Sequence, residues 1–548
     1  MLRLLALLAL FAVPSQAVER KTLRLNDFSC GLILGQGYDQ GSTIGRIAPG
    51  CSRDATNVYF SKKNGAVTAR ERYKGANTSA INSNSTSTVQ WLGDFFDSSK
   101  TSYLLARSNE YMARCTGNSP LSCTVITGVQ LNSTTPIQGI VTLNRAWFVG
   151  GGTKPFSIDR NFVVRFNVNA PDGTLIGDFR NRLLISGVPG NESTLYISGQ
   201  DNAEDWTNGT QTTSPLTFTV GGSNNPEIIT CLMGNQDDVY RVGTIAKIFS
   251  LLGFDQDDFR MAESAKVGCY TPRSATIFSD GSMIWLGDNG FYELRANDLK
   301  LISGNIKTLG ERIAFQGLSH VKGDRIRNFA SGDHKGDFWF SYVLSAAAGY
   351  TDNTSVVVYE RPNGNWTTFT GINASSFARY GGSCNSLDPF HFGNSNADGS
   401  INAFGIQGNT TGGASTPCSG TSESAFEARF ELWPFDAGEA SQIKAFETAY
   451  VVTHSTPHEF FAPYDPMQTK VFYTMDSAFF DSNSEVFVGT ITAQNISRLQ
   501  APRLNFAQSG VGSIPKGRWI SLGFSSILQK NPLLIEDVIL LYTVLGRL

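Results

Sequence analysis

Residues Ser274 to Ser303 are SATIFSDGSMIWLGDNGFYELRANDLKLIS, with four short apolar runs in thirty residues. These runs are β-branched, aromatic or aliphatic, which is typical of strands. They are separated by Asp280-Gly281, Asp288-Asn289-Gly290 and Asn297-Asp298, residue types that tolerate the positive φ of tight hairpin turns. Four antiparallel strands in one meander predict a blade of a β-propeller. The alternative is a single four-stranded sheet in another kind of β-rich protein.

Strand-turn-strand units of this kind recur on both sides of that stretch, without an exact repeat. They number six or seven between about residues 85 and 425, so the number of blades stays open. After the polar stretch at 408–424, the apolar runs become longer and alternate, as in a β-sandwich. We therefore expect an all-β chain with an N-terminal extended segment at 18–84, a β-propeller at 85–425 and a β-sandwich at 426–548.

Composition agrees with many short strands joined by tight turns. The chain has 548 residues, 55 of them glycine, with 11% aromatic and only 17% charged residues. Its formal net charge is −3, which gives no reason to expect tight, salt-sensitive binding to nucleic acid. Any contact with DNA is therefore expected to be loose or local.

The first seventeen residues form a separate segment. Arg3 precedes an apolar run of ten residues from Leu4 to Val13, and Ser15-Gln16-Ala17 fits a small-x-small cleavage site. This pattern predicts a secretory signal peptide that is cleaved after Ala17, and it is too short for a comfortable membrane span. The alternative is an N-terminal arm that the mature protein retains. We expect no membrane span elsewhere in the chain.

Eight cysteines follow, and they fall into four sequential pairs. Such spacing favours local disulfides formed in an oxidising compartment, although eight cysteines allow about 105 pairings. The candidate pairs are Cys30 with Cys51, Cys115 with Cys123, Cys231 with Cys269, and Cys384 with Cys418. Ten Asn-x-Ser/Thr sequons accompany them and leave open an extracellular glycoprotein of a cellular host.

Motifs for catalysis are missing from the sequence. It has no GxSxG, no HExxH and no phosphate-binding glycine loop before a lysine, and only five histidines. We therefore expect no catalytic residues, no cofactor and no metal site. The carboxylates at Asp237-Asp238 and Asp255-Gln256-Asp257-Asp258 form the two acidic clusters. Two carboxylates facing one sugar bond would serve a glycosidase, whereas adjacent acids on a turn are usually a solvated surface.

Three groups of motifs, in a fixed order, resemble the tail nozzle or tail-hub proteins of short-tailed bacteriophages, also called packaged-DNA stabilisation proteins. The first is Asp27 to Leu32, then Ala48 to Phe60 and Gly65 to Arg70, which match "DFSGG", Pro-Gly before "DAxNV", and "GAxTxR". The second is Tyr196 to Trp206, with its "DW" turn. The third combines Ile248 to Ser250, Gly268 to Tyr270 and the blade quoted above.

The resemblance covers most of residues 25–545 and implies a structural virion protein without enzymatic activity. Such subunits form a closed ring, typically six-fold, below the portal and adaptor of the tail. The ring retains DNA and then conducts it, without sequence-specific binding. A virion protein assembled in bacterial cytoplasm needs neither a signal peptide nor disulfides, so residues 1–17 and the cysteines favour the alternative, a secreted propeller that binds or hydrolyses glycans.

Loops on a rigid scaffold are the natural places for contacts with partners. For the ring we single out Asp255, Asp257, Asp258 and Arg260 as candidate interface residues, together with the loop from Ala347 to Asn353. For the glycan-binding alternative, the candidate carboxylates are those of Asp237, Asp238, Asp255 and Asp258.

Overall fold

The computed structural model describes most of the strands and the turns between them. The described residues are 20–34, 50–60, 65–77, 79–81, 88–117, 120–207, 209–236, 238–306, 309, 329–342, 353–381, 390–395, 398–404, 426–435, 437, 441–452, 467–475, 485–493, 503–506, 514–528 and 534–547. Residues 1–17, the stretch at 408–424, Cys384, Cys418, Asp237 and residues 347–352 lie outside them. Within these ranges the protein is all-β, as predicted.

Five four-stranded antiparallel sheets follow one another along the chain, each with its strands paired in sequence order. Their strands are β6 (Val89–Phe96), β7 (Ser102–Ser108), β8 (Tyr111–Thr116) and β9 (Ser122–Ile126) in blade 1; β10 (Ile137–Thr142), β11 (Arg145–Gly150), β12 (Phe156–Asp159) and β13 (Val164–Phe166) in blade 2; β14 (Leu175–Phe179), β15 (Arg182–Ser186), β16 (Thr194–Ile197) and β17 (Leu216–Thr219) in blade 3; β18 (Ile229–Gln236), β19 (Val239–Thr244), β20 (Ile248–Leu252) and β21 (Arg260–Ala265) in blade 4; and β22 (Thr276–Ile277), β23 (Met283–Gly287), β24 (Gly290–Arg295) and β25 (Asp298–Leu301) in blade 5.

Two further blades complete the disc. Blade 6 contains β26 (Ala330–His334), β27 (Asp337–Tyr342), β28 (Ser355–Glu360) and β29 (Asn365–Thr370). Blade 7 contains β30 (Ala374–Arg379), β31 (Phe390–Asn394) and β32 (Ile401–Phe404), and its outermost strand is β5 (Tyr73–Gly75) from the N-terminal part of the chain.

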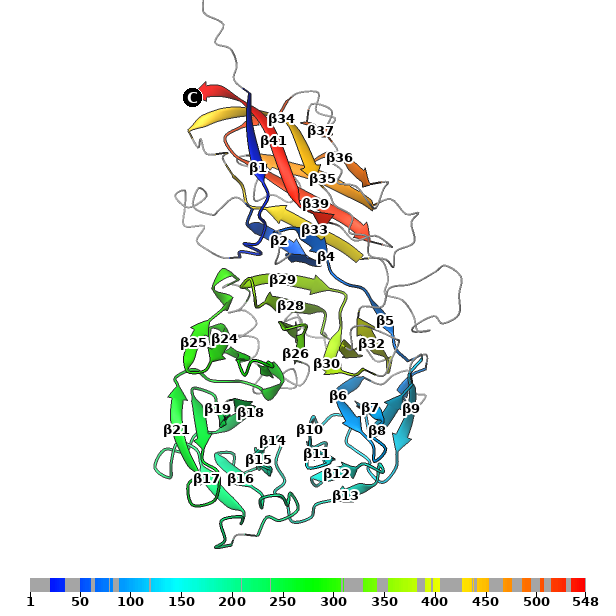
Figure 1. The fold of residues 1–548 in the computed structure, drawn as a ribbon, viewed down its shortest axis with the longest axis vertical. Coiled ribbons are helices and arrows are strands. Elements are labelled where there is room, and N and C mark those ends of the chain that lie inside the picture. Colours follow the sequence, from blue (N-terminus) through cyan, green and yellow to red (C-terminus); the bar gives the residue numbers. More distant parts are fainter. Residues whose placement is uncertain are drawn as a thin grey trace, which may run out of the picture.

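The seven innermost strands close a ring. Each of β6, β10, β14, β18, β22, β26 and β30 contacts the innermost strand of the next blade, and β30 contacts β6. The described residues therefore form a seven-bladed β-propeller, seen nearly face-on in Figure 1.

The meander at Ser274–Ser303 is blade 5, as the sequence predicted. Its β23 is buried along its whole length, and the indole of Trp285 donates to the carbonyl of Gly268 at 3.1 Å. The 3-10 turns η3 (Pro272–Ser274) and η4 (Ser303–Asn305) flank the blade. Each strand of blade 5 pairs with the strand next to it in the sequence, so the residues of the connecting turns were sufficient to predict the blade.

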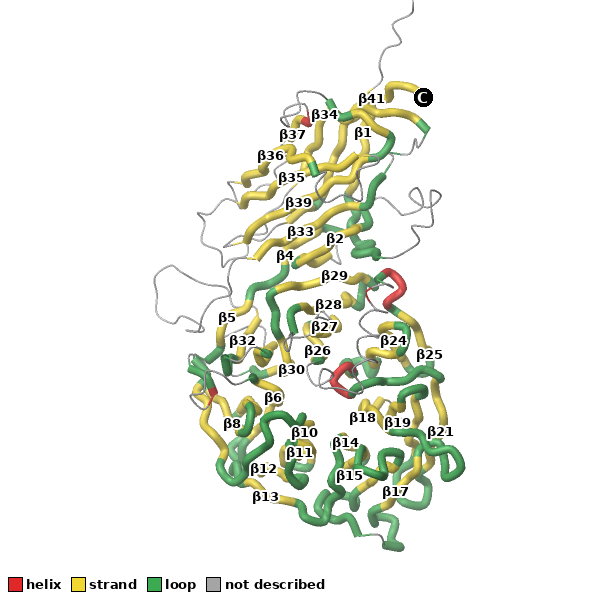
Figure 2. Tube along the Cα trace, turned by 180° about the vertical axis from the view of Figure 1, so that it is seen from behind, coloured by secondary structure: helices red, strands yellow, loops and turns green. Residues whose placement is uncertain are grey.

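A second β unit adjoins blade 6. The sheet of blade 6 continues from β29 through β2 (Ser52–Thr56), β33 (Phe426–Leu432), β39 (Ile520–Leu528), β35 (Met467–Met475) and β36 (Val486–Ala493), nine strands in all. Figure 2 shows this band running from the propeller into the second unit. A five-stranded sheet contains β1 (Arg20–Leu25), β41 (Asp537–Arg547), β34 (Gln442–Val452), β37 (Arg503–Asn505) and β38 (Lys516–Gly517), and a three-stranded one contains β3 (Val58–Phe60), β4 (Val67–Ala69) and β40 (Leu534–Ile535).

The second unit is built from both ends of the chain. Strand β1 pairs with β41 from Arg20 opposite Thr543 to Leu25 opposite Val538, and β2 pairs with β33. The propeller is thus inserted between the N-terminal and C-terminal strands of one unit. The segment at 18–84 contributes strands to the second unit and to blade 7, in addition to linking them. That the second unit is a β-sandwich stays a prediction.

Candidate functional site at the junction of the propeller and the second unit

The N-terminal motif residues converge where the second unit meets blade 6. Phe28 is fully buried, donates its N–H to the carbonyl of Gly65 at 3.0 Å, and packs edge-on against Phe430 with ring centroids 5.3 Å apart. Gly31 has φ +70, and a Cβ there would lie 2.8 Å from the Cβ of Asn365 in β29. Only glycine fits this left-handed position at such close approach to the propeller.

Asn57 joins both units through its side-chain amide. Its Oδ1 accepts from Nε of Arg70 and from the N–H of Thr370, each at 2.9 Å. Its Nδ2 donates to Oγ1 of Thr370 at 2.9 Å and to the carbonyl of Glu427 at 2.8 Å. The backbone φ is +58, a conformation that asparagine tolerates better than most residues. Asn57 is 1% exposed, so it connects β29 of the propeller with β33 of the second unit in the absence of competing water.

Arg70 completes this connection from the segment between β4 and β5. Its Nη2 donates to the carbonyl of Thr370 at 3.1 Å, and its guanidinium lies over the ring of Phe426, 3.8 Å from the centroid. Arg70 is 3% exposed. A buried guanidinium without partners is energetically costly, and here neutral acceptors and an aromatic ring supply those partners. The two units therefore favour the arrangement that keeps these contacts.

Glu71 fixes the strand segment that follows. Its carboxylate pairs with Nζ of Lys335 at 2.7 Å, and Nε2 of the buried His334 lies 3.7 Å away, both in the first turn of blade 6. Burial alone would raise the pKa of Glu71, but the hydrogen bonds and charges of His334 and Lys335 outweigh it and lower the pKa to about 2. The carboxylate is therefore charged at neutral pH and holds the entry to β5.

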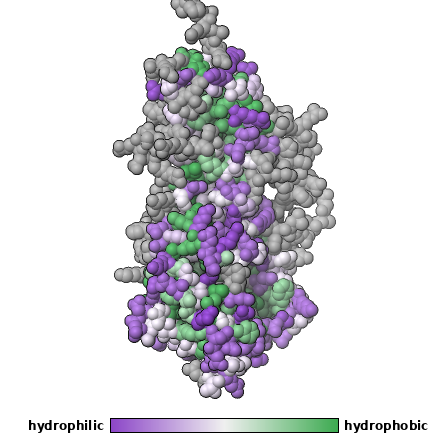
Figure 3. All heavy atoms as spheres, turned by 60° about the vertical axis from the view of Figure 1, so that its left-hand side comes forward, coloured by the Kyte–Doolittle hydropathy of each residue, from purple (hydrophilic) through white to green (hydrophobic). Residues whose placement is uncertain are grey.

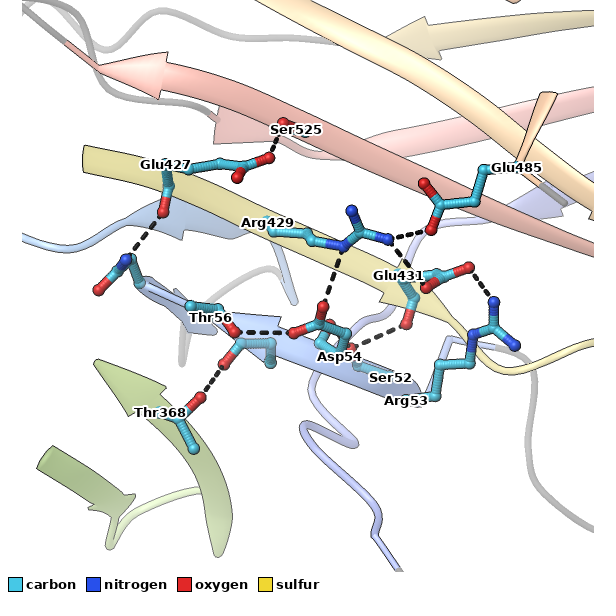
Figure 4. A network of polar contacts seen from close by, with 12 residues as sticks. Ser52, Arg53, Asp54, Thr56, Thr368, Glu427, Arg429, Glu431, Glu485 and Ser525 are labelled. Atoms are coloured by element: carbon cyan, nitrogen blue, oxygen red, sulfur yellow. Dashed lines mark hydrogen bonds and ion pairs between the residues drawn. The ribbon is translucent and has the colours of Figure 1, made fainter. Parts of the chain in front are cut away.

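A second polar network crosses the continuous sheet beside Asn57 (Figure 4). The guanidinium of Arg429 in β33 pairs with Asp54 in β2 at 3.0 Å, with Glu431 at 3.5 Å and with Glu485 next to β36. Arg53 pairs with the other oxygen of Glu431. These ion pairs span the strands that carry the sheet away from the propeller.

This network has more carboxylates than guanidiniums, which perturbs its protonation. Burial raises the pKa of Asp54, although the hydrogen bond from Thr56 and the charge of Arg429 act in the opposite direction. For Arg429 burial acts to lower the pKa, but the hydrogen bond to Glu485 and the neighbouring carboxylates outweigh it and raise it. Arg429 is thus held firmly in its charged form. The arrangement supports a structural role in fixing the two units.

The predicted interface residues lie elsewhere, on the turn between β20 and β21 of blade 4. Oδ1 of Asp258 accepts from the N–H groups of Phe254 at 2.7 Å and Asp255 at 2.9 Å, and these hydrogen bonds lower its pKa. Asp255 in turn accepts from the N–H of Asp257 at 3.0 Å, whereas Arg260 is exposed at the start of β21. Two of the three carboxylates therefore shape the turn, and Asp257 and Arg260 point to solvent.

The other candidate residues also fall outside the junction. Asp238 lies in the turn between β18 and β19 and pairs with Arg180 at 3.2 Å. Asn353, the last residue of the candidate loop from Ala347, is buried and donates to the carbonyl of Ala374.

Three of the proposed cysteine pairs are disulfides in the structure, whereas Cys384 and Cys418 lie outside the described residues. The bonded pairs are Cys30 with Cys51, Cys115 with Cys123, and Cys231 with Cys269. The first closes the loop between the first two N-terminal motifs, and the last connects β18 of blade 4 to the segment that enters blade 5.

Asn57 and Arg70 lie within the N-terminal motifs, but the sequence alone predicted no role for either. The signal was present: an asparagine between two strand-like runs, followed by an arginine before the next turn. The partners of Asn57 are Thr370 and Glu427, which lie 313 and 370 residues further along the chain. No local pattern predicts such contacts.

Comparisons with known proteins bear on the fold alone. No family model matches the chain, and no curated protein matches it. Virginiamycin B lyase from Staphylococcus aureus is 10% identical over 60% of this chain and 97% of its own, with a TM-score of 0.36. An extracellular domain from B. thetaiotaomicron is 10% identical over 92% of this chain and 63% of its own, with a TM-score of 0.40. The N-terminal domain of Nup159 is 10% identical over 65% and 99%, with a TM-score of 0.34.

The strand order of the chain itself defines its class: a seven-bladed β-propeller inserted into a second β unit and fastened to it by a buried polar junction. Within the described residues, no group of histidines, cysteines and carboxylates is arranged to hold a metal ion. No helix in that part of the chain has the length and apolar character needed to cross a membrane.

Proposed function

We propose that the protein is a structural subunit of a phage tail nozzle or hub, a ring below the portal and adaptor that retains DNA and then conducts it. The observation that carries this proposal is the junction. The motifs between Asp27 and Arg70, which resemble those of nozzle proteins, contain the residues that fix the propeller to the second unit. This is what a shared architecture would require of them.

A ring subunit needs such rigidity. A heterologous interface generates a closed ring only if each subunit presents its two contact surfaces at a constant angle, and otherwise it generates open filaments. The continuous nine-stranded sheet, the insertion of the propeller and the buried Asn57 and Arg70 all resist rotation between the two units. A net charge of −3 also suits a conduit, because a strongly basic wall would hold DNA by its phosphates.

The sequons give independent support. Asn77, Asn353 and Asn365 are all less than 8% exposed, and Oδ1 of Asn77 accepts from the N–H of Ile401 at 2.7 Å. A glycan on any of these three amides would prevent the burial that the fold requires. The sequons are therefore better explained by a composition rich in asparagine, serine and threonine than by passage through a glycosylating compartment.

The disulfides favour a second candidate, a secreted propeller that binds or hydrolyses glycans. Disulfides persist in oxidising surroundings, and residues 1–17 have the pattern of a secretory signal. Virions also meet an oxidising medium after release, so disulfide formation in the particle reconciles these bonds with the leading proposal.

Deletion of the reading frame from the phage that carries it tests the leading proposal. Particles without this protein are expected to package DNA and then lose it, and plasmid-borne wild-type protein restores DNA retention. Particles that retain DNA and infect normally without the protein would contradict the proposal. For the secreted alternative, glycan-binding measurements on wild type and on Asp238→Asn with Asp257→Asn would show binding that the substitutions abolish.

A further inference from the structure

The charge of the propeller is divided between two flanks. Residues 89–166, which form blades 1 and 2, contain seven basic and four acidic residues, a net charge of +3. Residues 175–265, which form blades 3 and 4, contain five basic and twelve acidic residues, a net charge of −7. We call these the basic flank and the acidic flank. They lie on opposite sides of the long axis of the molecule in Figure 1, right and left respectively.

The basic flank combines free cations with exposed apolar side chains at its rim. Arg160 and Arg165 are exposed and form no ion pair with the described part of the chain. Around them, Val163 is 50%, Phe166 45% and Val168 70% exposed, along or next to the outermost strand β13. Arginine and aromatic side chains are enriched in protein interfaces, and grouped exposed apolar side chains mark such surfaces.

The acidic flank offers the complementary features. Asp201 and Asp257 are exposed, and neither carboxylate accepts a hydrogen bond from a described residue. Their loops contact each other, because the N–H of Gln256 donates to the carbonyl of Thr212 at 3.1 Å. Phe254, beside them, is 53% exposed. Figure 3 brings this side of the molecule forward and shows a mostly hydrophilic lower part with separate hydrophobic spots.

We infer that the partner of each flank is a second copy of this chain: the basic flank of one copy binds the acidic flank of the next, head to tail. This inference rests on the proposed ring function and identifies the surfaces that form the ring. Two different surfaces on opposite sides of the long axis make a heterologous contact, and this contact closes into a ring when successive copies are rotated by a constant angle about an axis parallel to the long axis. Opposite charges on the two flanks accelerate association of the copies and fix how the flanks align. They also disfavour contacts between two basic or two acidic flanks.

Two charge-reversal variants test the inference. R160E/R165E changes the net charge of the basic flank from +3 to −1. D201K/D257K changes the net charge of the acidic flank from −7 to −3 and places two cations on its surface. The control K266E/K300E reverses two exposed lysines outside both flanks. Analytical ultracentrifugation at low and high salt measures the mass of each protein against the 59.5 kDa of one chain. The wild type is expected to form a closed assembly that salt weakens, and the control is expected to match it.

Each flank variant alone places like charges opposite one another at the substituted positions and is expected to sediment as one chain, whereas an equimolar mixture of the two is expected to regain the wild-type assembly. When the two variants alternate in the mixture, each substituted flank faces the oppositely substituted flank of the next copy, so opposite charges meet again at positions 160, 165, 201 and 257. Recovery of the assembly therefore also shows that both variants fold. Wild-type assembly by either variant alone, a mixture that stays dissociated, or a wild type that forms only single chains or two-fold dimers would overturn the inference. DNA retention in complemented particles separates this result from the proposed function, because a ring built through other surfaces would still retain DNA.

Discussion

Asn57→Ala is the sharpest perturbation of the junction. The substitution removes four hydrogen bonds and leaves Nε of Arg70, the N–H of Thr370 and the carbonyl of Glu427 without their amide partner. A buried polar group that loses its partner costs about 1 to 3 kcal/mol. Alanine at φ +58 adds about 1 kcal/mol of backbone strain. We expect a loss of about 4 kcal/mol in the free energy of unfolding, a large part of the roughly 5 to 15 kcal/mol of a typical domain.

Two companion variants separate the contributions. Asn57→Gly loses the same hydrogen bonds without the strain, so it is expected to be about 1 kcal/mol more stable than Asn57→Ala. Asn181→Ala is the matched control, because Asn181 also has a positive φ of 56 but is exposed in the turn between β14 and β15. It is expected to lose only the strain, about 1 kcal/mol.

Urea unfolding followed by tryptophan fluorescence measures these differences, and limited proteolysis of the native proteins locates them. Asn57→Ala is expected to expose cleavage sites between the propeller and the second unit at urea concentrations where wild type resists. If Asn57→Ala and Asn181→Ala unfold within about 1 kcal/mol of each other, the amide does not fasten the junction and the reasoning from its hydrogen bonds fails.

Three further predictions follow from single contacts. Glu71→Gln removes a carboxylate whose pKa is about 2 in the folded protein and 4.5 ordinarily. The stability that the Glu71 carboxylate contributes is present above pH 4.5 and is lost as the pH falls towards 2. The difference between the thermal midpoints of wild type and Glu71→Gln should therefore narrow over that pH range. A difference that stays constant would contradict this prediction. Cys231→Ser with Cys269→Ser removes a disulfide that joins residues 38 apart in the sequence, and it should lower the free energy of unfolding by about 3 to 4 kcal/mol. Urea unfolding under non-reducing conditions measures this loss. Equal stability of wild type and variant would show that the disulfide contributes nothing. Gly177→Ala places a Cβ 1.8 Å from Oη of the buried Tyr240, so the tyrosine must move. We expect the free energy of unfolding to fall by about 2 kcal/mol and Tyr240→Phe to restore part of it. If Tyr240→Phe restores no stability, the clash is not the cause of the loss.

The sequence was sufficient for elements held by neighbouring residues. Blade 5 could be predicted because its strands pair in sequence order across two turns of two residues and one connection of five, all rich in residues that favour tight reversal. The closure of blade 7 could not, because β5 pairs with β32 more than three hundred residues later, Gly75 opposite Asn402. The pairing of β1 with β41, at the two ends of the chain, could not be predicted for the same reason.

The candidate site shows the same division. The run from Asp255 to Asp258 was visible as a turn, and the structure places it in one whose geometry two of the carboxylates fix. The role of Asn57 could not be predicted, because hydrogen bonds that span 313 and 370 residues leave no trace in local periodicity. Tertiary partners, rather than the residue type, give Asn57 its role.

The most direct test of the proposed function is mass spectrometry of gradient-purified particles from the phage that encodes this chain. The proposal predicts several copies of the protein per particle, comparable in number to the portal protein and located in the tail. Absence of the protein from the particles, together with a single-chain form in the culture medium that begins at Val18, would contradict a tail nozzle and favour the secreted propeller.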